Sequence, residues 1–266
     1  MSAQVLNFGC RLNAYESEVM RGHARGQDNT IIINTCAVTA EAERQARQTI
    51  RRLRRENPRA HIVVTGCAAQ LNPETFAAMD EVDRVLGNEE KLDPGLLAGK
   101  GAAVEVADIM TVRETAAHLI SGFEGRTRAF VQIQQGCDHR CTFCIVPYVR
   151  GPEKNRKPGE VLREIKEIAD SGVTEVTLLG QTVNSYEADG QSFPDLLRSV
   201  ARVPGIRRVR FTSPHPNDVT TDLLDVMAEE TAVCEQLHLP LQAGSDRTLR
   251  RMLRRYTVEG FLEKVD

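Results

Sequence analysis

The chain has 266 residues, of which 41% are hydrophobic, and its formal net charge is −3. This length can bury the core of one large domain or of two ordinary ones. No run approaches the roughly 20 apolar residues of a membrane span, and residues 1–20 lack the basic-then-apolar order of a signal peptide. The composition therefore excludes a membrane protein and predicts a cytoplasmic one. Seven cysteines, an odd number, indicate metal ligation in a reducing compartment rather than a disulfide framework.

The first half of the chain alternates strands with helices. Four apolar runs are typical of strands: residues 5–8, 30–34, 61–65 and 82–86. Helices are predicted at residues 14–20 and between Thr39, which can cap the second helix, and Pro58. Residues 95–101 are predicted to form a loop. This alternation predicts a parallel sheet, whose ligands gather at the carboxyl ends of its strands.

Each of the first three strands ends at a cysteine. Cys10, Cys36 and Cys67 are spaced one strand-helix unit apart, so the predicted sheet brings them to the same edge. They could be three small buried residues, because free cysteine is commonly buried. The convergence of three strand ends favours the alternative, in which their thiolates hold an iron-sulfur cluster.

A second triplet, Cys137, Cys141 and Cys144, follows the strand predicted at residues 129–134. A structural zinc knuckle with His139 as the fourth ligand is one interpretation. A cubane held by only three thiolates is the other, and it leaves one iron open for a substrate or cofactor. The CxxxCxxC spacing favours the cluster, and Phe143 beside the last cysteine favours it further. This stretch resembles the signature of the radical S-adenosylmethionine (SAM) enzymes, in which the open iron binds SAM and the aromatic residue lies near its adenine.

The second half of the chain continues with strand-helix units. A helix is predicted from Pro158 to Gly172. Three units follow, with strands at 175–179, 208–212 and 236–239 and helices at 193–202, 222–229 and 245–255. Repeated units of this kind predict a barrel or an open doubly wound sheet.

Polar residues follow these strands, at the end where a barrel keeps its active site. Each alone could simply cap a loop. As a set at the mouth that also holds Cys137, they are candidates for holding SAM and substrate: Gln181, Asn184, Ser213, His215, His238 and Gln242. None of them is singled out as a catalytic residue.

Residues 8–17, 34–39 and 65–68, which contain the first three cysteines, resemble the three cysteine motifs of the methylthiotransferases. The segments LLGQ at 178–181, SPHP at 213–216 and LHLPLQ at 237–242 support the same resemblance. Cys234 matches neither cysteine set, and we expect a buried free thiol there.

The resemblance implies an α/β protein with an N-terminal parallel-sheet methylthiotransferase domain at residues 1–106. A linker at 107–125 and a radical-SAM partial TIM-type barrel at 126–266 would follow. The implied cofactors are SAM and two [4Fe-4S] clusters, one on each cysteine triplet. Family members usually have six barrel units and a small C-terminal β-domain for RNA, so a chain that stops at Asp266 is expected to be C-terminally incomplete.

The implied activity is that of a tRNA methylthiotransferase. One cluster would reduce SAM to methionine and a deoxyadenosyl radical, which activates carbon 2 of an adenine beside the anticodon. Sulfur carried on the other cluster, methylated by a second SAM, would then be inserted. The implied partners are the tRNA anticodon loop and an electron donor such as flavodoxin or ferredoxin, and a monomer is expected.

The two halves of the chain differ in which branch of the family they resemble. Up to about Gly151 the motifs are most similar to the branch that acts on N6-threonylcarbamoyladenosine, and from Pro152 onward to the branch that acts on N6-isopentenyladenosine. The first match is longer, so threonylcarbamoyladenosine is the expected substrate. The alternatives are isopentenyladenosine, an aspartate of a ribosomal protein, and a non-enzymatic metal-stapled scaffold or cluster carrier.

The helix after Thr39 is rich in arginine, with acidic residues at its start. This order suits the helix dipole and fits a solvated surface helix. The alternative is a face that follows the phosphates of RNA.

Overall fold

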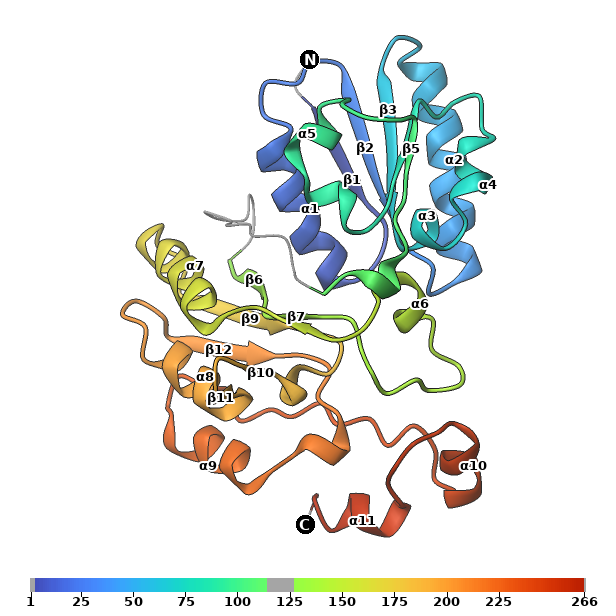
Figure 1. The fold of residues 1–266 in the computed structure, drawn as a ribbon. Coiled ribbons are helices and arrows are strands. Elements are labelled where there is room, and N and C mark those ends of the chain that lie inside the picture. Colours follow the sequence, from blue (N-terminus) through green and yellow to red (C-terminus); the bar gives the residue numbers. More distant parts are fainter. Residues whose placement is uncertain (1–2, 114–126, 266) are drawn as a thin grey trace. The chain divides into compact units, whose positions relative to one another are not determined.

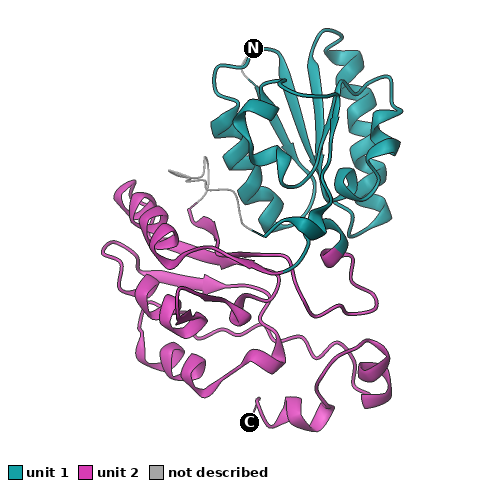
Figure 2. Cartoon of the chain, in the orientation of Figure 1, with its two compact units in different colours: residues 1–120, 148–152 teal, residues 121–147, 153–266 magenta. Residues whose placement is uncertain are grey.

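The computed structural model describes residues 3–113 and 127–265. It divides into two compact units (Figure 2). Unit 1 consists of residues 1–120 and 148–152, and unit 2 of residues 121–147 and 153–266. Within the described ranges, no helix is long and apolar enough to cross a membrane. The predicted linker at 107–125 falls largely outside the described residues.

Unit 1 contains a parallel five-stranded sheet in the order β1-β2-β3-β4-β5 (Figure 1). Its strands are β1 (Gln4–Asn7), β2 (Thr30–Thr35), β3 (His61–Gly66), β4 (Arg84–Leu86) and β5 (Val104–Glu105). All six residues of β2 are buried, as expected where helices cover both faces of a parallel sheet. The four strands predicted in this half are therefore confirmed, with β5 as an addition.

Helices cover both faces of this sheet in Figure 1. They are α1 (Arg11–His23), α2 (Ala40–Glu56), α3 (Cys67–Leu71), α4 (Pro73–Ala77) and α5 (Pro94–Leu97), with short 3-10 turns η1 (Glu90–Leu92) and η2 (Ile109–Thr111). Ile31 and Ile33 of β2 pack with Ile50 of α2. The intervening Ile32 packs with Met20 of α1. The alternation of side chains along a strand thus divides the core into two layers.

Helices in unit 1 differ from the predicted ones at α1 and α5. Helix α1 runs from Arg11 to His23, three residues beyond the predicted helix at each end, with Cys10 as its N-cap. The region predicted as a loop at 95–101 contains part of α5, because Asp93 accepts hydrogen bonds from the amides of Gly95 and Leu96. An Asp N-cap followed by proline is a helix-start signal that the sequence does contain.

Unit 2 has a parallel three-stranded sheet in the order β12-β9-β6. The strands are β6 (Ala129–Gln132), β9 (Glu175–Leu179) and β12 (Arg208–Phe211). Two short ladders accompany it, β7 (Gln134–Gln135) with β8 (Lys154–Asn155) and β10 (Glu187–Ala188) with β11 (Gln191–Ser192). Its helices and 3-10 turns are α7 (Pro158–Asp170), η3 (Val183–Ser185), α8 (Phe193–Ala201), η4 (Pro216–Asp218), α9 (Thr221–Glu229), α10 (Asp246–Arg251) and α11 (Val258–Leu262). Helix α6 (Val146–Arg150) begins in unit 2 and ends in unit 1, since residues 148–152 belong to unit 1.

The strand predicted at 236–239 is wrong. The parallel pairing with β12 is limited to a bridge between Val209 and Val233, and Cys234 donates its amide to Val209 at 3.0 Å. A strand needs a continuous ladder of backbone partners, and β12 supplies them only as far as Cys234. An apolar run alone does not reveal where a neighbouring strand stops.

Candidate functional site

Cys10, Cys36 and Cys67 lie at the carboxyl ends of neighbouring strands of unit 1. Cys10 caps α1 after β1, Cys36 follows β2, and Cys67 begins α3 after β3. Cys36 and Cys67 are buried, and Cys10 is exposed. Burial raises the pKa of the Cys36 thiol, and negative charge on Cys67 and Cys10 raises it further. The three sulfurs are thus close enough to interact electrostatically, and a bound cation would relieve that repulsion.

Two glycines allow the backbone to bring these cysteines together. Gly9 has φ 138°, and a Cβ there would lie 2.8 Å from the Cβ of Cys36. Gly66 has φ 94°, and a Cβ there would collide with the backbone of Thr35. Only glycine tolerates both the positive φ and the close approach. The result is a cradle in which three thiols converge, and this donor set fits a cluster held by three thiolates.

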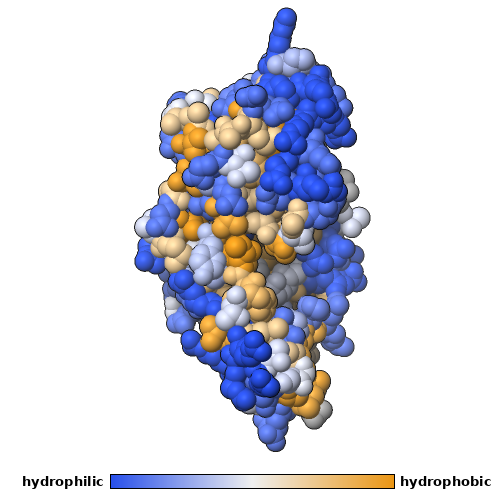
Figure 3. All heavy atoms as spheres, turned by 90° about the vertical axis from the view of Figure 1, so that its right-hand side faces the viewer, coloured by the Kyte–Doolittle hydropathy of each residue, from blue (hydrophilic) through white to orange (hydrophobic). Residues whose placement is uncertain are grey.

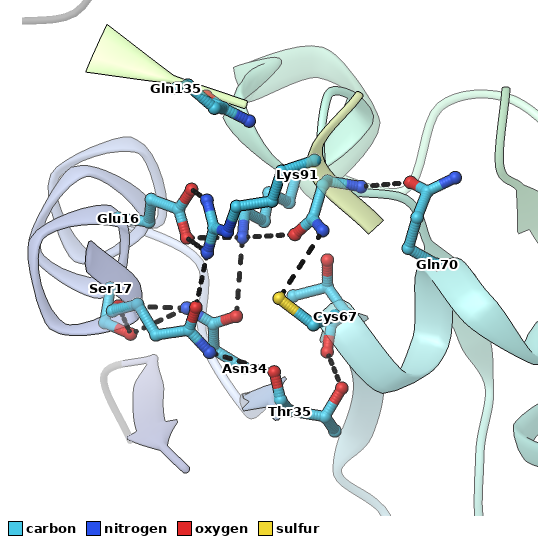
Figure 4. Close-up of polar contacts among 12 residues, drawn as sticks. Glu16, Ser17, Asn34, Thr35, Cys67, Gln70, Lys91 and Gln135 are labelled. Carbon is cyan, nitrogen blue, oxygen red and sulfur yellow. Dashed lines mark hydrogen bonds and ion pairs between the residues drawn. The ribbon is translucent and has the colours of Figure 1, made fainter. Parts of the chain in front are cut away.

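A buried group of ionised side chains lies beside these thiols. Glu16 of α1 accepts hydrogen bonds from Lys91 at 2.6 Å and from Arg150 at 2.5 and 3.0 Å. The exposed fractions of the three side chains are 0%, 0% and 2%. Figure 4 shows this group, with the carboxylate of Glu16 and the sulfur of Cys67 on either side of the polar contacts that Lys91 makes. We refer to Glu16, Lys91 and Arg150 as the buried charge cluster.

Asparagine amides connect the buried charge cluster to the thiols. Asn88 accepts a hydrogen bond from Lys91 at 2.7 Å, while its amide nitrogen lies 3.8 Å from the sulfur of Cys67. Asn13 accepts from Arg150 at 2.5 Å and from the thiol of Cys10 at 3.9 Å. The buried charge cluster is therefore connected, through Asn88 and Asn13, to the thiols of Cys67 and Cys10.

Opposite charges keep the carboxylate of Glu16 ionised. Burial by itself disfavours the charged carboxylate of Glu16, but Arg150 and Lys91 outweigh burial and lower its pKa to about 2. Burial lowers the pKa of Lys91, and Glu16 opposes that effect. Glu16 thus stays a carboxylate at neutral pH.

Sequence reasoning missed this cluster, although α1 carried a signal. This helix carries three buried polar residues spaced by three and one positions, Asn13, Glu16 and Ser17. At that spacing they share a face with the core residue Met20. Polar residues on the buried face of an amphipathic helix indicate partners from elsewhere in the chain. The partners themselves could not be identified, because Lys91 and Arg150 lie 75 and 134 residues from Glu16.

Cys137, Cys141 and Cys144 lie in one loop of unit 2. Gly136, with φ 82°, precedes the buried Cys137. Burial raises the pKa of the Cys137 thiol, and negative charge on Cys144 and Cys141 adds to the effect. The side chain of Gln181 accepts a hydrogen bond from the Gly136 amide at 2.8 Å. The structure thus brings the three thiols together and places one predicted polar residue against their loop.

Two more of the predicted polar residues pair with each other. Asn184 donates to the carbonyl of His215 at 2.9 Å and accepts from its amide at 2.7 Å. The ring of His215 stacks on that of His139, with centroids 3.9 Å apart and planes 12° apart. An Asp218 oxygen lies 3.6 Å from Nε2 of His139. His139 is therefore held by His215 and Asp218, and it ties the cysteine loop to the loop after β12.

The remaining predicted residues are solvent-exposed. Phe143 has an exposed fraction of 55%, and the guanidinium of Arg254 lies 5.6 Å from its ring centroid. Ser213 and Gln242 adopt positive φ values of 60° and 72°. His238 and Gln242 lie in the irregular segment that replaces the predicted fourth strand of unit 2. The structure brings Gln181, Asn184 and His215 to the cysteine loop or its neighbour, and shows no such placement for His238 and Gln242 among the described residues.

Comparison with known families decides the class of this chain. Residues 131–266 match the radical SAM superfamily. The chain belongs to that superfamily. Residues 2–87 match a second family, described as uncharacterized protein family UPF0004. Radical SAM proteins use SAM and a [4Fe-4S] cluster. These are the cofactors implied by the resemblance of the Cys137, Cys141 and Cys144 segment to the radical SAM signature.

Curated relatives match nearly the whole chain. A threonylcarbamoyladenosine tRNA methylthiotransferase, MtaB, of Rickettsia prowazekii is 42% identical over 98% of this chain and 63% of its own length. A tRNA-2-methylthio-N(6)-dimethylallyladenosine synthase of Corynebacterium diphtheriae is 39% identical over 98% of this chain and 56% of its own. The chain thus spans roughly three fifths of the length of these relatives.

A solved structure confirms the fold class. The radical SAM methyltransferase TsrM of Kitasatospora setae superposes with a TM-score of 0.65 at 16% sequence identity. The match covers 96% of this chain and 57% of TsrM. At this identity the likeness concerns the fold alone, and it supports the predicted α/β architecture.

The arginines of α2 are largely engaged within unit 1 of this radical SAM protein. Arg44 pairs with Glu41 and Arg47 with Glu43, each at 2.6 Å. Arg54 donates to the carbonyls of Ala60 and Glu81 at 2.7 and 2.9 Å. Figure 3, viewed from the side on which α2 lies in Figure 1, shows a surface with both hydrophilic and hydrophobic areas. These pairs are those expected of a solvated surface helix. For the alternative, a face that binds RNA phosphates, the exposed arginines are Arg51, Arg52 and Arg55.

We expect Arg54→Met to lower the free energy of unfolding by about 1–3 kcal/mol, because it leaves several backbone carbonyls without their charged donor. Arg52→Met is the matched control on the same helix. Its side chain is 58% exposed, and its distance to Glu56 is 3.9 Å, so we expect a change of about 0.5 kcal/mol or less. Urea unfolding followed by circular dichroism measures both. Equal losses for the two variants would contradict a structural role for Arg54.

Proposed function

We propose that this chain carries the catalytic part of a tRNA methylthiotransferase that modifies carbon 2 of N6-threonylcarbamoyladenosine beside the anticodon. One observation carries the proposal: each compact unit gathers its own three thiols, in a chain that belongs to the radical SAM superfamily. A radical SAM reaction that needs only SAM cleavage uses one such triplet. A second triplet fits a reaction that also delivers sulfur.

In this proposal Cys137, Cys141 and Cys144 hold the cluster that binds SAM. Cys10, Cys36 and Cys67 hold the second cluster. When bound, these groups supply the electron that cleaves SAM and the sulfur that is transferred.

The chain's own residues position and shield these groups. Gln181 fixes the loop of the first cluster through the Gly136 amide. Asn184 and His215 fix the adjacent loop. Exposed Phe143 is available to stack on the adenine of SAM, with Arg254 as its neighbour. Ser213, His238 and Gln242 remain candidates for contacts with SAM or RNA.

The proposal extends to the organisation and partners of the protein. We assign residues 1–106 to the methylthiotransferase domain, 107–125 to a linker and 126–266 to the radical-SAM core. The partners are the tRNA anticodon loop, whose bases can be splayed out and read individually, and a flavodoxin- or ferredoxin-type electron donor. The protein would act as a monomer in the cytoplasm.

A second candidate substrate is N6-isopentenyladenosine. Several relatives of 38–41% identity are named as 2-methylthio-N(6)-dimethylallyladenosine synthases, and dimethylallyl is the same substituent as isopentenyl in this name. The 42% identity to the threonylcarbamoyladenosine enzyme favours the first candidate by a small margin.

Nucleoside analysis decides between the two substrates. The gene for this protein is expressed in cells that lack both methylthiolation activities, and tRNA nucleosides are analysed by mass spectrometry. We expect the methylthio derivative of threonylcarbamoyladenosine, and its absence when the gene carries Cys67→Ala. Methylthio-isopentenyladenosine alone would replace the first candidate by the second. If neither nucleoside forms, the proposed function is wrong.

A further inference from the structure

By formal charge, the buried charge cluster has two cationic side chains and one carboxylate. Lys91 and Arg150 share the single carboxylate of Glu16, and the three side chains are at most 2% exposed. The other groups that they contact, such as Asn13, Asn34 and Asn88, are neutral amides. An uncompensated buried charge is costly, so the surplus indicates a negative partner in the working protein.

Hydrogen bonds connect the two cations to two of the three thiols of unit 1. Lys91 donates to Asn88, whose amide nitrogen lies 3.8 Å from the sulfur of Cys67. Arg150 donates to Asn13, which also accepts from the thiol of Cys10 at 3.9 Å. Burial disfavours the charged form of Arg150, but Glu16 together with thiolates at Cys67 and Cys10 raises its pKa overall. Burial lowers the pKa of Lys91 overall, and negative charge on Glu16 and Cys67 opposes that effect. The surplus positive charge therefore lies beside the thiols of unit 1.

A cluster held by three thiolates supplies the missing negative charge. A [4Fe-4S] core with a charge of about +2 and three thiolates has a net charge of about −1, and one-electron reduction makes it about −2. Buried positive charge nearby favours the more negative state, because Coulomb interactions are only weakly screened away from water.

We propose that Lys91 and Arg150 are charge-compensating residues that raise the reduction potential of the cluster held by Cys10, Cys36 and Cys67. Glu16 orients both cations, and its single charge leaves one positive charge to act on the cluster. This inference rests on the proposed function only in that the triplet must hold a cluster.

The test uses the reconstituted chain carrying Cys137→Ala and Cys141→Ala, so that only the cluster of unit 1 is observed. Lys91→Met and Arg150→Met each remove one cation and leave the other paired with Glu16. Iron and sulfide are quantified, and the midpoint potential is measured by a redox titration followed by electron paramagnetic resonance. We expect each variant to disfavour reduction at least tenfold, which is about 59 mV for a one-electron couple.

Two further variants separate charge from structure. Arg150→Lys keeps the positive charge, and we expect a potential close to that of the parent. Arg54→Met removes a cation beside Ala60 and Asp83, at the amino ends of β3 and β4, opposite the strand ends that bear the cysteines. We expect it to leave the potential unchanged.

Each outcome has a defined meaning. A tenfold or larger shift in the Lys91→Met and Arg150→Met variants alone supports the inference. If Arg150→Met does not fold, Lys91→Met decides by itself. A normal iron content with potentials equal to that of Arg54→Met overturns the inference and leaves the proposed function standing. If the parent binds no iron, the triplet holds no cluster, and both proposals fail.

Discussion

Replacing Cys141 by Ala is expected to remove about four of about eight irons from the anaerobically reconstituted chain. The loss is confined to one cluster, because Cys141 belongs to unit 2 while Cys10, Cys36 and Cys67 belong to unit 1. The same variant should release no deoxyadenosine from SAM, since its remaining cluster is the one proposed to carry sulfur. Iron and sulfide assays with liquid chromatography of the SAM products measure both effects.

Cys234→Ala is the matched control for this prediction. Cys234 lies outside both triplets and is partly exposed rather than buried as the sequence led us to expect. We expect this variant to keep about eight irons and normal release of deoxyadenosine. A parent protein with one zinc and no sulfide would contradict the assignment of both triplets and favour a zinc-stapled scaffold.

The strand-helix alternation of unit 1 could be predicted because its strands have apolar centres and the first three end at Gly-Cys or Thr-Cys. The buried run from Ile31 to Ile33 fixes β2 as an interior strand between β1 and β3, and parallel pairing then aligns the strand ends. The convergence of Cys10, Cys36 and Cys67 follows from that topology. The third strand-helix pair predicted after α7 had no such buried run. Its predicted strand at 236–239 has no neighbouring strand to pair with among the described residues.

The buried charge cluster could not be predicted, because its energetics depend on tertiary contacts. Nothing in the sequence around Lys91 or Arg150 indicates that these side chains are buried. Each can be buried at low cost only when it is paired with a carboxylate. Glu16 provides that partner from a helix that precedes both by more than 70 residues. Residues whose role arises from such pairing carry no local periodic signal.

Glu16→Gln is expected to lower the free energy of unfolding by about 3–5 kcal/mol, the range for removing one partner of a buried ion pair. In protein prepared without added iron, the buried Lys91 and Arg150 would then have no negatively charged partner. Lys91→Met should cost less, because Arg150 and Glu16 remain paired at 2.5 Å. Urea unfolding under reducing conditions, followed by circular dichroism, measures both. Equal losses would contradict a shared carboxylate.

The loss caused by Glu16→Gln should depend on pH in one window. The folded protein holds the pKa of Glu16 at about 2, below its ordinary value of 4.5. The stabilisation from its ionised form is therefore complete above about pH 4.5 and disappears as the pH falls toward 2, where the folded form also takes up the proton. The difference in unfolding free energy between parent and variant should narrow across that interval.

Glu43→Gln is the control for this prediction. It removes a partly exposed partner of Arg47, and we expect a loss of only about 0.5 kcal/mol. A difference between parent and Glu16→Gln that stays constant from pH 5 to the lowest pH at which the parent still folds would show that Glu16 is not held ionised by Lys91 and Arg150.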